Sequence, residues 1–199
     1  MHTWHWISSA ICLVCMMLFA ITGITLNHAS AFEAQPKETL LELTLPADVK
    51  LELNNIIERS VDGSFPKLIP SSLHQYLLEQ NALIDTAILQ QEPEWSAYEV
   101  YLQKPFAGGD SWISIDIETG ELTYSHTDRG WVAWLNDLHK GRNTHVAWLW
   151  FIDIFAIATL IFCITGMVLL QLHSKNRRST WYVTSAGFLV PAILAIYLV

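Results

Sequence analysis

The chain alternates between long apolar segments and one long polar segment. Three segments carry almost no Asp, Glu, Lys or Arg, the single exception being Asp153; they are residues 4–26, 146–172 and 181–199. At about 1.5 Å per helical residue, each reaches roughly 28 Å or more, enough to cross a hydrocarbon core of about 30 Å. The pattern predicts three transmembrane helices.

The polar segment predicts one small α+β domain inserted between the first two helices. Apolar residues at helical spacing predict two helices, the first capped by Asp48 and ending before Gly63, the second capped by Ser71 or Ser72. Strands are predicted over residues 82–89, 98–103, 112–117 and 121–125, with Gly120 in a hairpin that requires positive φ. We therefore divide the chain into a first transmembrane helix (residues 1–28), the α+β domain (29–130) and an interfacial amphipathic segment (131–144). These are followed by a second transmembrane helix (145–173), a basic loop (174–180) and a third transmembrane helix (181–199).

Charge gives the orientation. Residues 29–145 hold 18 of the 19 Asp/Glu but 8 of the 11 Lys/Arg, so the inserted domain is acidic and we expect no nucleic-acid partner. The short loop between the last two helices holds Lys175, Arg177 and Arg178. Short basic loops stay in the cytoplasm. We therefore expect a bacterial inner-membrane protein with a cytoplasmic N-terminus and residues 29–145 in the periplasm.

Two features of the apolar segments have alternative interpretations. The small residues 29–31 resemble a signal-peptide cleavage site, although the apolar run is long and no positive charge precedes it. Cys12 and Cys15 form a C-x-x-C and Cys163 is isolated. Because all three lie within predicted membrane helices, we interpret them as small packing residues.

Several motifs together resemble a known family. The hairpin Ser114–Leu122 resembles the last hairpin of PepSY domains, which carries an Asp, a short gap and Thr-Gly-Glu. The segments Asn136–Arg142 and Ile21–His28, with the Asp153 helix and its basic exit, are similar to the PepSY-associated transmembrane helix family. Residues 32–70 match no part of it. The resemblance implies a PepSY-like periplasmic domain on a helical membrane anchor.

An internal echo joins the first two membrane helices. Phe19–Leu26 (FAITGITL) parallels Phe162–Leu169 (FCITGMVL), although the two helices run in opposite directions through the membrane. Such a similarity is either a small inverted repeat or the use of small residues where helices approach closely.

Histidines lie at both ends of these two helices. His2 and His5 begin the first helix and His28 ends it, while His139 and His145 precede the second and His173 ends it. Antiparallel packing would bring His5 beside His173 at the inner face and His28 beside His139 at the outer face. Two imidazoles on facing helices are what a six-coordinate b-type haem requires. The alternative is that they are interfacial residues that reach headgroup water.

The resemblance favours haem, because the similar family includes siderophore reductases of the inner membrane that look built with two haems on helix histidines. It favours His5, His28, His139 and His173 as iron ligands, with weaker support for His2 and His145. Asp153 lies about two turns into the second helix, where a carboxylate is costly. It is either a hydrogen-bonded neutral group that orients a neighbour such as Trp131 or His28, or a proton or haem-propionate partner.

Two functions from different classes remain at this point. The first is a transmembrane electron-transfer component with haem b, a redox partner in the membrane or periplasm, and a second copy of the chain if three helices do not enclose the haem. No nucleotide or flavin fingerprint is present, so the electron donor would be a partner or a quinone. The second is a membrane-anchored periplasmic binding or regulatory module with no redox activity. Ion or proton transport would rest on Asp153 alone.

The segment before the second membrane helix predicts a helix lying flat on the outer leaflet, because its apolar residues have the spacing of one helix face: Trp131, Trp134, Leu135 and Leu138.

Overall fold

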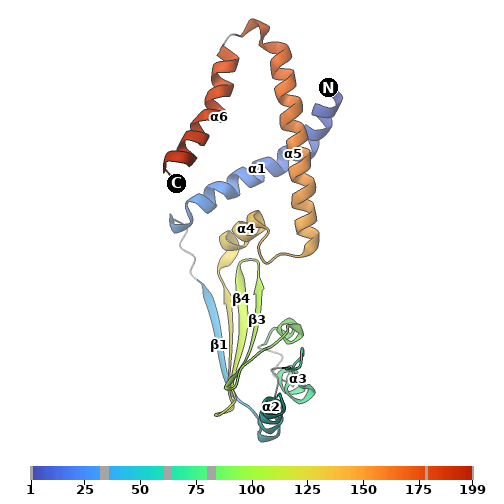
Figure 1. Ribbon diagram of the computed structural model, residues 1–199, viewed down its shortest axis with the longest axis vertical. Helices are drawn as coiled ribbons and strands as arrows, with labels where there is room; N and C mark the ends of the chain where they lie inside the picture. The colour runs from blue at the N-terminus through green and yellow to red at the C-terminus, as the bar shows by residue number, and fades with distance from the viewer. Residues whose placement is uncertain (1, 32–35, 61–63, 80–83, 178, 199) are drawn as a thin grey trace. The chain divides into compact units, whose positions relative to one another are not determined.

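The computed structural model describes residues 2–31, 36–60, 64–79, 84–177 and 179–198 (Figure 1). The chain divides into two compact units: a helical unit of Met1–Ile21 and Ala147–Val199, and a mixed unit of Thr22–Val146. The first helix, α1 (His2–Asn27), contributes most of its length to the helical unit and its last turns to the mixed unit.

The helical unit contains the three predicted membrane helices. Besides α1 it holds α5 (Val146–His173) and α6 (Ser179–Leu198), joined by the short turn η3 (Ser174–Asn176). All three are long and apolar enough to cross a membrane, which confirms the pattern. Most of their side chains are exposed, as expected for helices whose solvent is lipid. Cys12 is buried in α1 and is a free thiol, consistent with packing.

Within this unit α1 and α5 pack antiparallel. The ring centroids of Phe19 and Phe155 are 5.0 Å apart, and those of His5 and Phe162 are 4.8 Å apart. Residue numbers rise along α1 as they fall along α5, which is the antiparallel arrangement expected from the sequence.

The mixed unit is built on a five-stranded antiparallel sheet in the order β1-β5-β4-β3-β2. Its strands are β1 (Lys37–Thr44), β2 (Glu94–Trp95), β3 (Glu99–Phe106), β4 (Gly109–Asp116) and β5 (Glu121–Asp128). Ile113, Ile115 and Ile117 are all buried, as their alternation predicts. Gly120 has φ of 78° in the β4–β5 turn, so the hairpin prediction is also confirmed.

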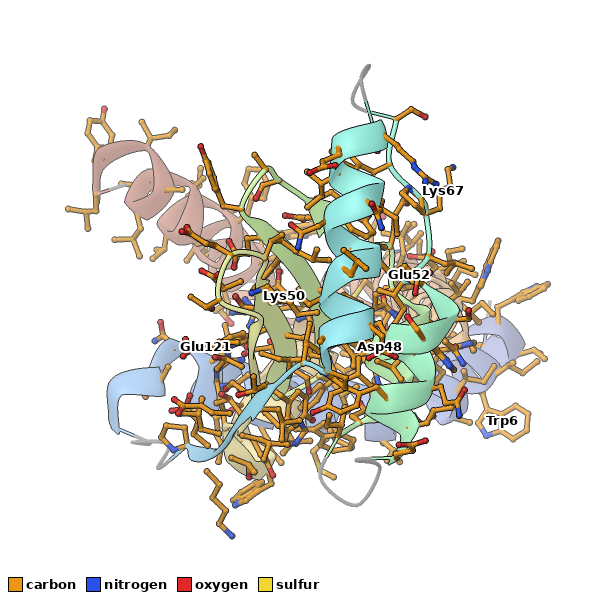
Figure 2. The ribbon with its side chains drawn as sticks, turned by 90° about the horizontal axis from the view of Figure 1, so that it is seen from below. Trp6, Asp48, Lys50, Glu52, Lys67 and Glu121 are labelled. Carbon is orange, nitrogen blue, oxygen red and sulfur yellow. The ribbon has the colours of Figure 1, made fainter. Side chains whose placement is uncertain are left out.

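Two helices and a 3₁₀ turn cover one face of this sheet: α2 (Ala47–Arg59), α3 (Ser71–Glu79) and η2 (Thr86–Gln90). Figure 2 shows α2 with Lys50, whose Nζ donates to the Glu118 carbonyl at 2.6 Å beside the β4–β5 turn. The core is aliphatic apart from Tyr124; its buried members include Val49, Leu53, Leu73, Leu77, Ile88, Val100, Leu102, Ile113, Ile115 and Leu122.

Three details of the sequence prediction are wrong. The strand over 82–89 is instead the turn η2, because the Asp85 carboxylate caps it by accepting from Ala87 N at 3.0 Å; residues 82 and 83 lie outside the described residues. The helix α2 begins after Pro46, and Asp48 lies in its first turn without capping it. In α3, the Ser72 hydroxyl bonds Glu52 of α2 rather than capping its own helix.

The sequence interpretation also missed two strands, β1 and the short β2. β1 pairs with β5 along its whole length, and it falls in the stretch that matched no family motif. Gly63, the predicted end of the first helix, lies outside the described residues.

Candidate functional site

The predicted interfacial segment forms the helix α4 (Gly130–Lys140), held against the sheet by one buried carboxylate. Asp137 is only 3% exposed and accepts from Gly108 N at 2.9 Å. It also accepts from Arg142 Nε at 2.9 Å, and Arg142 Nη2 lies 2.6 Å away. Gly141 ends the helix in the left-handed conformation (φ 65°) and turns the chain back so that Arg142 reaches Asp137. Trp131 and Trp134 remain exposed on this helix.

Helix α4 also contacts the end of α1 through two side-chain hydrogen bonds. His139 Nδ1 lies 2.6 Å from Thr22 Oγ1, and Thr25 Oγ1 donates to Asn136 Oδ1 at 3.0 Å. Both pairs of residues are three apart on their own helices, so they lie on matching faces. The motif Asn136–Arg142 is therefore a clamp: its Asp binds the sheet, and its Asn and His bind α1.

A second histidine is held in the same way inside the helical unit. His5 Nδ1 lies 3.0 Å from Thr165 Oγ1 of α5, and its ring stacks on Phe162 at an interplanar angle of 15°. Thr165 is 7% exposed, which places this contact within the packed part of the two helices.

The two histidines at the helix ends bind their own helices. His28 Nδ1 lies 3.1 Å from the Ile24 carbonyl, and His173 Nδ1 lies 2.8 Å from the Leu169 carbonyl. Both rings are exposed. All four histidines favoured by the family resemblance therefore engage a protein oxygen through Nδ1.

These contacts define the tautomer of three rings. A carbonyl only accepts, so Nδ1 of His28 and of His173 carries the hydrogen, and in the neutral ring the lone pair lies on Nε2. The Thr165 hydroxyl donates its single hydrogen to the Ile161 carbonyl at 2.8 Å, with the Phe162 carbonyl at 3.1 Å. It therefore accepts from His5 Nδ1, which again leaves the lone pair on Nε2.

The predicted pairs of histidines are not in contact. His5 binds at Thr165, eight residues and hence about 12 Å along α5 from His173. His139 binds at Thr22, six residues and about 9 Å along α1 from His28. The structure brings each docked histidine to a Thr-Gly step rather than to a second histidine.

The remaining candidates lie apart from these contacts. His2 is exposed in the first turn of α1, and His145 is exposed just before α5. Asp153 is exposed on α5, with no hydrogen bond or ion pair to the described residues of the helical unit. Among the residues that the structure describes, no group of three or more His, Cys, Asp or Glu side chains is arranged to hold a metal ion.

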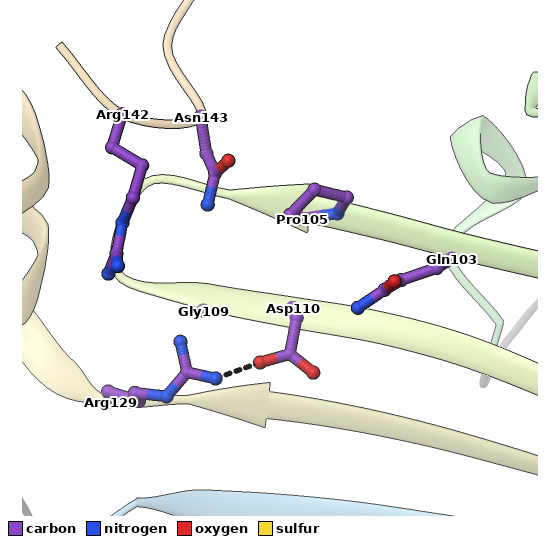
Figure 3. A pocket seen from close by; sticks show the side chains of 7 residues that line it. All are labelled: Gln103, Pro105, Gly109, Asp110, Arg129, Arg142 and Asn143. Atoms are coloured by element: carbon purple, nitrogen blue, oxygen red, sulfur yellow. Dashed lines mark hydrogen bonds and ion pairs between the residues drawn. The ribbon is translucent and has the colours of Figure 1, made fainter.

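Each unit also has a cavity. In the mixed unit, a polar cavity of about 430 Å³ lies beside the ends of β3 and β4 (Figure 3). Arg129 is paired there with Asp110 and Arg142 extends from the loop after α4; the other lining residues are Gln103, Pro105, Gly109 and Asn143. In the helical unit, an apolar cavity of about 410 Å³ is lined by Phe19, Ile152, Phe155, Ala156, Thr159, Leu160 and Cys163.

The sequence interpretation missed the residues that orient the histidines. Thr22 and Thr165 occupy equivalent places in the internal echo, so the signal was present but did not indicate a hydrogen-bond partner. Asp137 stood within a motif used for the resemblance, and nothing in the sequence pattern indicated that it is buried.

Comparison with known proteins gives the family. No curated protein and no solved structure matches the chain. The profile of one family, PepSY_TM-like, matches residues 1–199, which is the whole chain. With its three helices long enough to span a membrane and its antiparallel sheet, the protein belongs to the PepSY_TM-like family.

Proposed function

We propose that this membrane protein is a haem b-binding electron-transfer component of the bacterial inner membrane, similar in role to siderophore (ferric) reductases. The observation that carries the proposal is the shared geometry of His5, His28, His139 and His173. Histidines that bind metals almost always engage a protein oxygen through the other ring nitrogen, which fixes the tautomer and the ring orientation. All four do so through Nδ1.

The donor set fits haem better than a bare metal ion. Structural zinc takes four protein ligands and catalytic zinc usually three, whereas haem iron needs at most two axial imidazoles. The described residues offer single oriented imidazoles and no group of three ligands.

The residues then have separable tasks. When bound, haem supplies one-electron transfer between ferric and ferrous iron. Each of His5, His28, His139 and His173 would supply one axial imidazole, because the members of the two predicted pairs are about 12 Å and 9 Å apart along their helices. Because the members of each pair do not touch, a second copy of the chain is the alternative source of the opposing imidazole. The described residues of α6 bury no side chain against the rest of the chain, so this helix is available to contact a second copy.

The direction of electron flow follows from the membrane orientation that the basic loop predicts. With the loop containing Lys175 and Arg177 in the cytoplasm, α4 and the sheet would lie in the periplasm. Electrons would enter from a cytoplasmic or quinone donor and leave to an acceptor at the periplasmic domain, such as a ferric chelate. The clamp on α4 would keep His139 in a fixed position relative to that domain.

A second candidate function rests on the polar cavity of the mixed unit. Arg129 and Arg142 both line it, and guanidinium groups recognise carboxylates and phosphates. This favours a membrane-anchored periplasmic binding module, in which the histidines only pack helices.

One spectroscopic experiment separates the two. The full chain is purified in detergent from haem-replete cells, and its reduced-minus-oxidised visible spectrum is recorded. Electron transfer predicts b-type bands that are lost in His5→Ala and His139→Ala and retained in His74→Ala, a change to a histidine of α3 in the soluble domain. A spectrum without bands in the wild type supports the binding module instead.

A further inference from the structure

The internal echo has a specific counterpart in the structure. The sequence Ile-Thr-Gly occurs in both α1 and α5, and we call its last two residues a Thr-Gly step. The two Thr-Gly steps are Thr22-Gly23 in α1 and Thr165-Gly166 in α5. Each receives a histidine from another helix, His139 from α4 and His5 from α1. Two equivalent steps therefore make the same contact with two different partners.

The glycine and the threonine of each step act on the same ring. A Cβ placed on Gly166 would lie 3.4 Å from His5 Cε1, and one placed on Gly23 would lie 3.7 Å from His139 Cε1. A Cβ at either glycine would therefore be in van der Waals contact with the histidine ring, which lies directly over the glycine. The adjacent threonine hydroxyl meets Nδ1 of the same ring, at 3.0 Å and 2.6 Å respectively.

The direction of the hydrogen bond follows from the helix. Thr165 donates to the Ile161 carbonyl four residues earlier, so its oxygen accepts from His5. Thr and Ser within helices commonly form this bond to the carbonyl four residues earlier. If the Thr22 hydroxyl donates to the carbonyl four residues earlier in the same way, its oxygen accepts a hydrogen bond from His139 Nδ1.

We propose that the two Thr-Gly steps are imidazole-docking sites, and that Thr165 and Thr22 are positioning residues that hold His5 and His139 with Nδ1 protonated, the tautomer whose Nε2 is the nitrogen able to bind haem iron. The metal part of this statement rests on the proposed haem function. The docking and tautomer part does not.

The alternative is that the small residues only let helices approach closely. Under that alternative the hydroxyl is replaceable by a methyl group of the same shape. The test is therefore Thr165→Val and Thr22→Val, which keep the volume and remove the acceptor, with Thr165→Ser and Thr22→Ser, which restore it. The matched control is Thr184→Val, because Thr184 Oγ1 donates to the Thr180 carbonyl at 2.9 Å in α6 and is not bonded to a histidine.

The first measurement needs no haem. The full chain, labelled with ¹⁵N-histidine and purified from haem-depleted cells, is examined by NMR for the protonated nitrogen of each ring. We expect His5 to lose its Nδ1-protonated form in Thr165→Val and to recover it in Thr165→Ser, with no change in Thr184→Val. The same holds for His139 with the Thr22 variants. Unchanged tautomers in both Val variants overturn the proposal.

The second measurement is haem content after expression in haem-replete cells. Loss of a residue that orients a metal ligand typically lowers metal affinity by about 10–100-fold. We expect that loss in each Val variant and its recovery in each Ser variant. Full haem retention in the Val variants overturns the positioning role. Wild-type protein that lacks haem but switches tautomer in Thr165→Val would refute the proposed function alone and support the docking sites.

Discussion

Replacing Asp137 by alanine should release α4 from the sheet. The carboxylate is 3% exposed and is bonded to Gly108 N and to the Arg142 guanidinium. A hydrogen bond to a charged group contributes about 1.5–3 kcal/mol. The Gly108 bond counts nearly in full because it is buried, whereas Arg142 is 58% exposed and its contribution is reduced by solvent screening.

We therefore expect Asp137→Ala to destabilise the docked state of α4 by about 2–3 kcal/mol. At tenfold per 1.4 kcal/mol, amide hydrogen exchange in β3–β4 and α4 should accelerate by roughly 30- to 150-fold. The assay is hydrogen-exchange mass spectrometry on the full chain in detergent. Asp128→Asn is the matched control, because Asp128 also accepts a backbone N–H (Gly130 N, 2.8 Å) but is exposed. Equal exchange in Asp137→Ala and wild type would refute the clamp.

Other residues give independent expectations. Gly108→Ala should destabilise more than Gly130→Ala, because both have φ of 82° but only a Cβ at Gly108 would lie 2.9 Å from Trp134 Cβ; equal thermal shifts would exclude the steric contribution. Leu102→Ala, in the fully buried core, should cost about 2–5 kcal/mol by denaturant unfolding of the sheet. Burial acts to raise the pKa of Asp85, but the hydrogen bonds from Lys104 (2.6 Å) and Ala87 N outweigh it and hold that pKa below its ordinary value. Asp85 thus stabilises the fold above its unfolded pKa of about 3.9, and this is lost as pH falls through the folded pKa; Asp85→Asn should show a weaker acid transition by tryptophan fluorescence, and an unchanged transition would contradict this.

The parts of the fold predicted from the sequence are those with strong periodicity. The three apolar segments and the alternating Ile113, Ile115 and Ile117 each determine their structure locally, since burial follows directly from the pattern. The missed strand β1 is an edge strand that shows little alternation in exposure and is held by pairing with β5, a long-range contact that no local signal encodes. The wrong strand at 82–89 has apolar residues that reach the core from a turn, which periodicity alone does not distinguish from a strand.

The candidate site was predicted by residue type but not by arrangement. The histidines were identified from their positions at helix ends, which the sequence specifies. Their partners Thr22 and Thr165 depend on which helix faces meet, and this is decided by packing. Asp137 shows the same limit, because its burial comes from the β3–β4 turn and not from its own helix.

The measurement that tests the central claim most directly is the haem content of the purified wild-type chain. A pyridine haemochrome assay on protein from haem-replete cells should give b-type haem in stoichiometric amount, with the visible bands of low-spin iron held by two imidazoles. Protein that is folded by circular dichroism but contains no haem under these conditions would contradict the account.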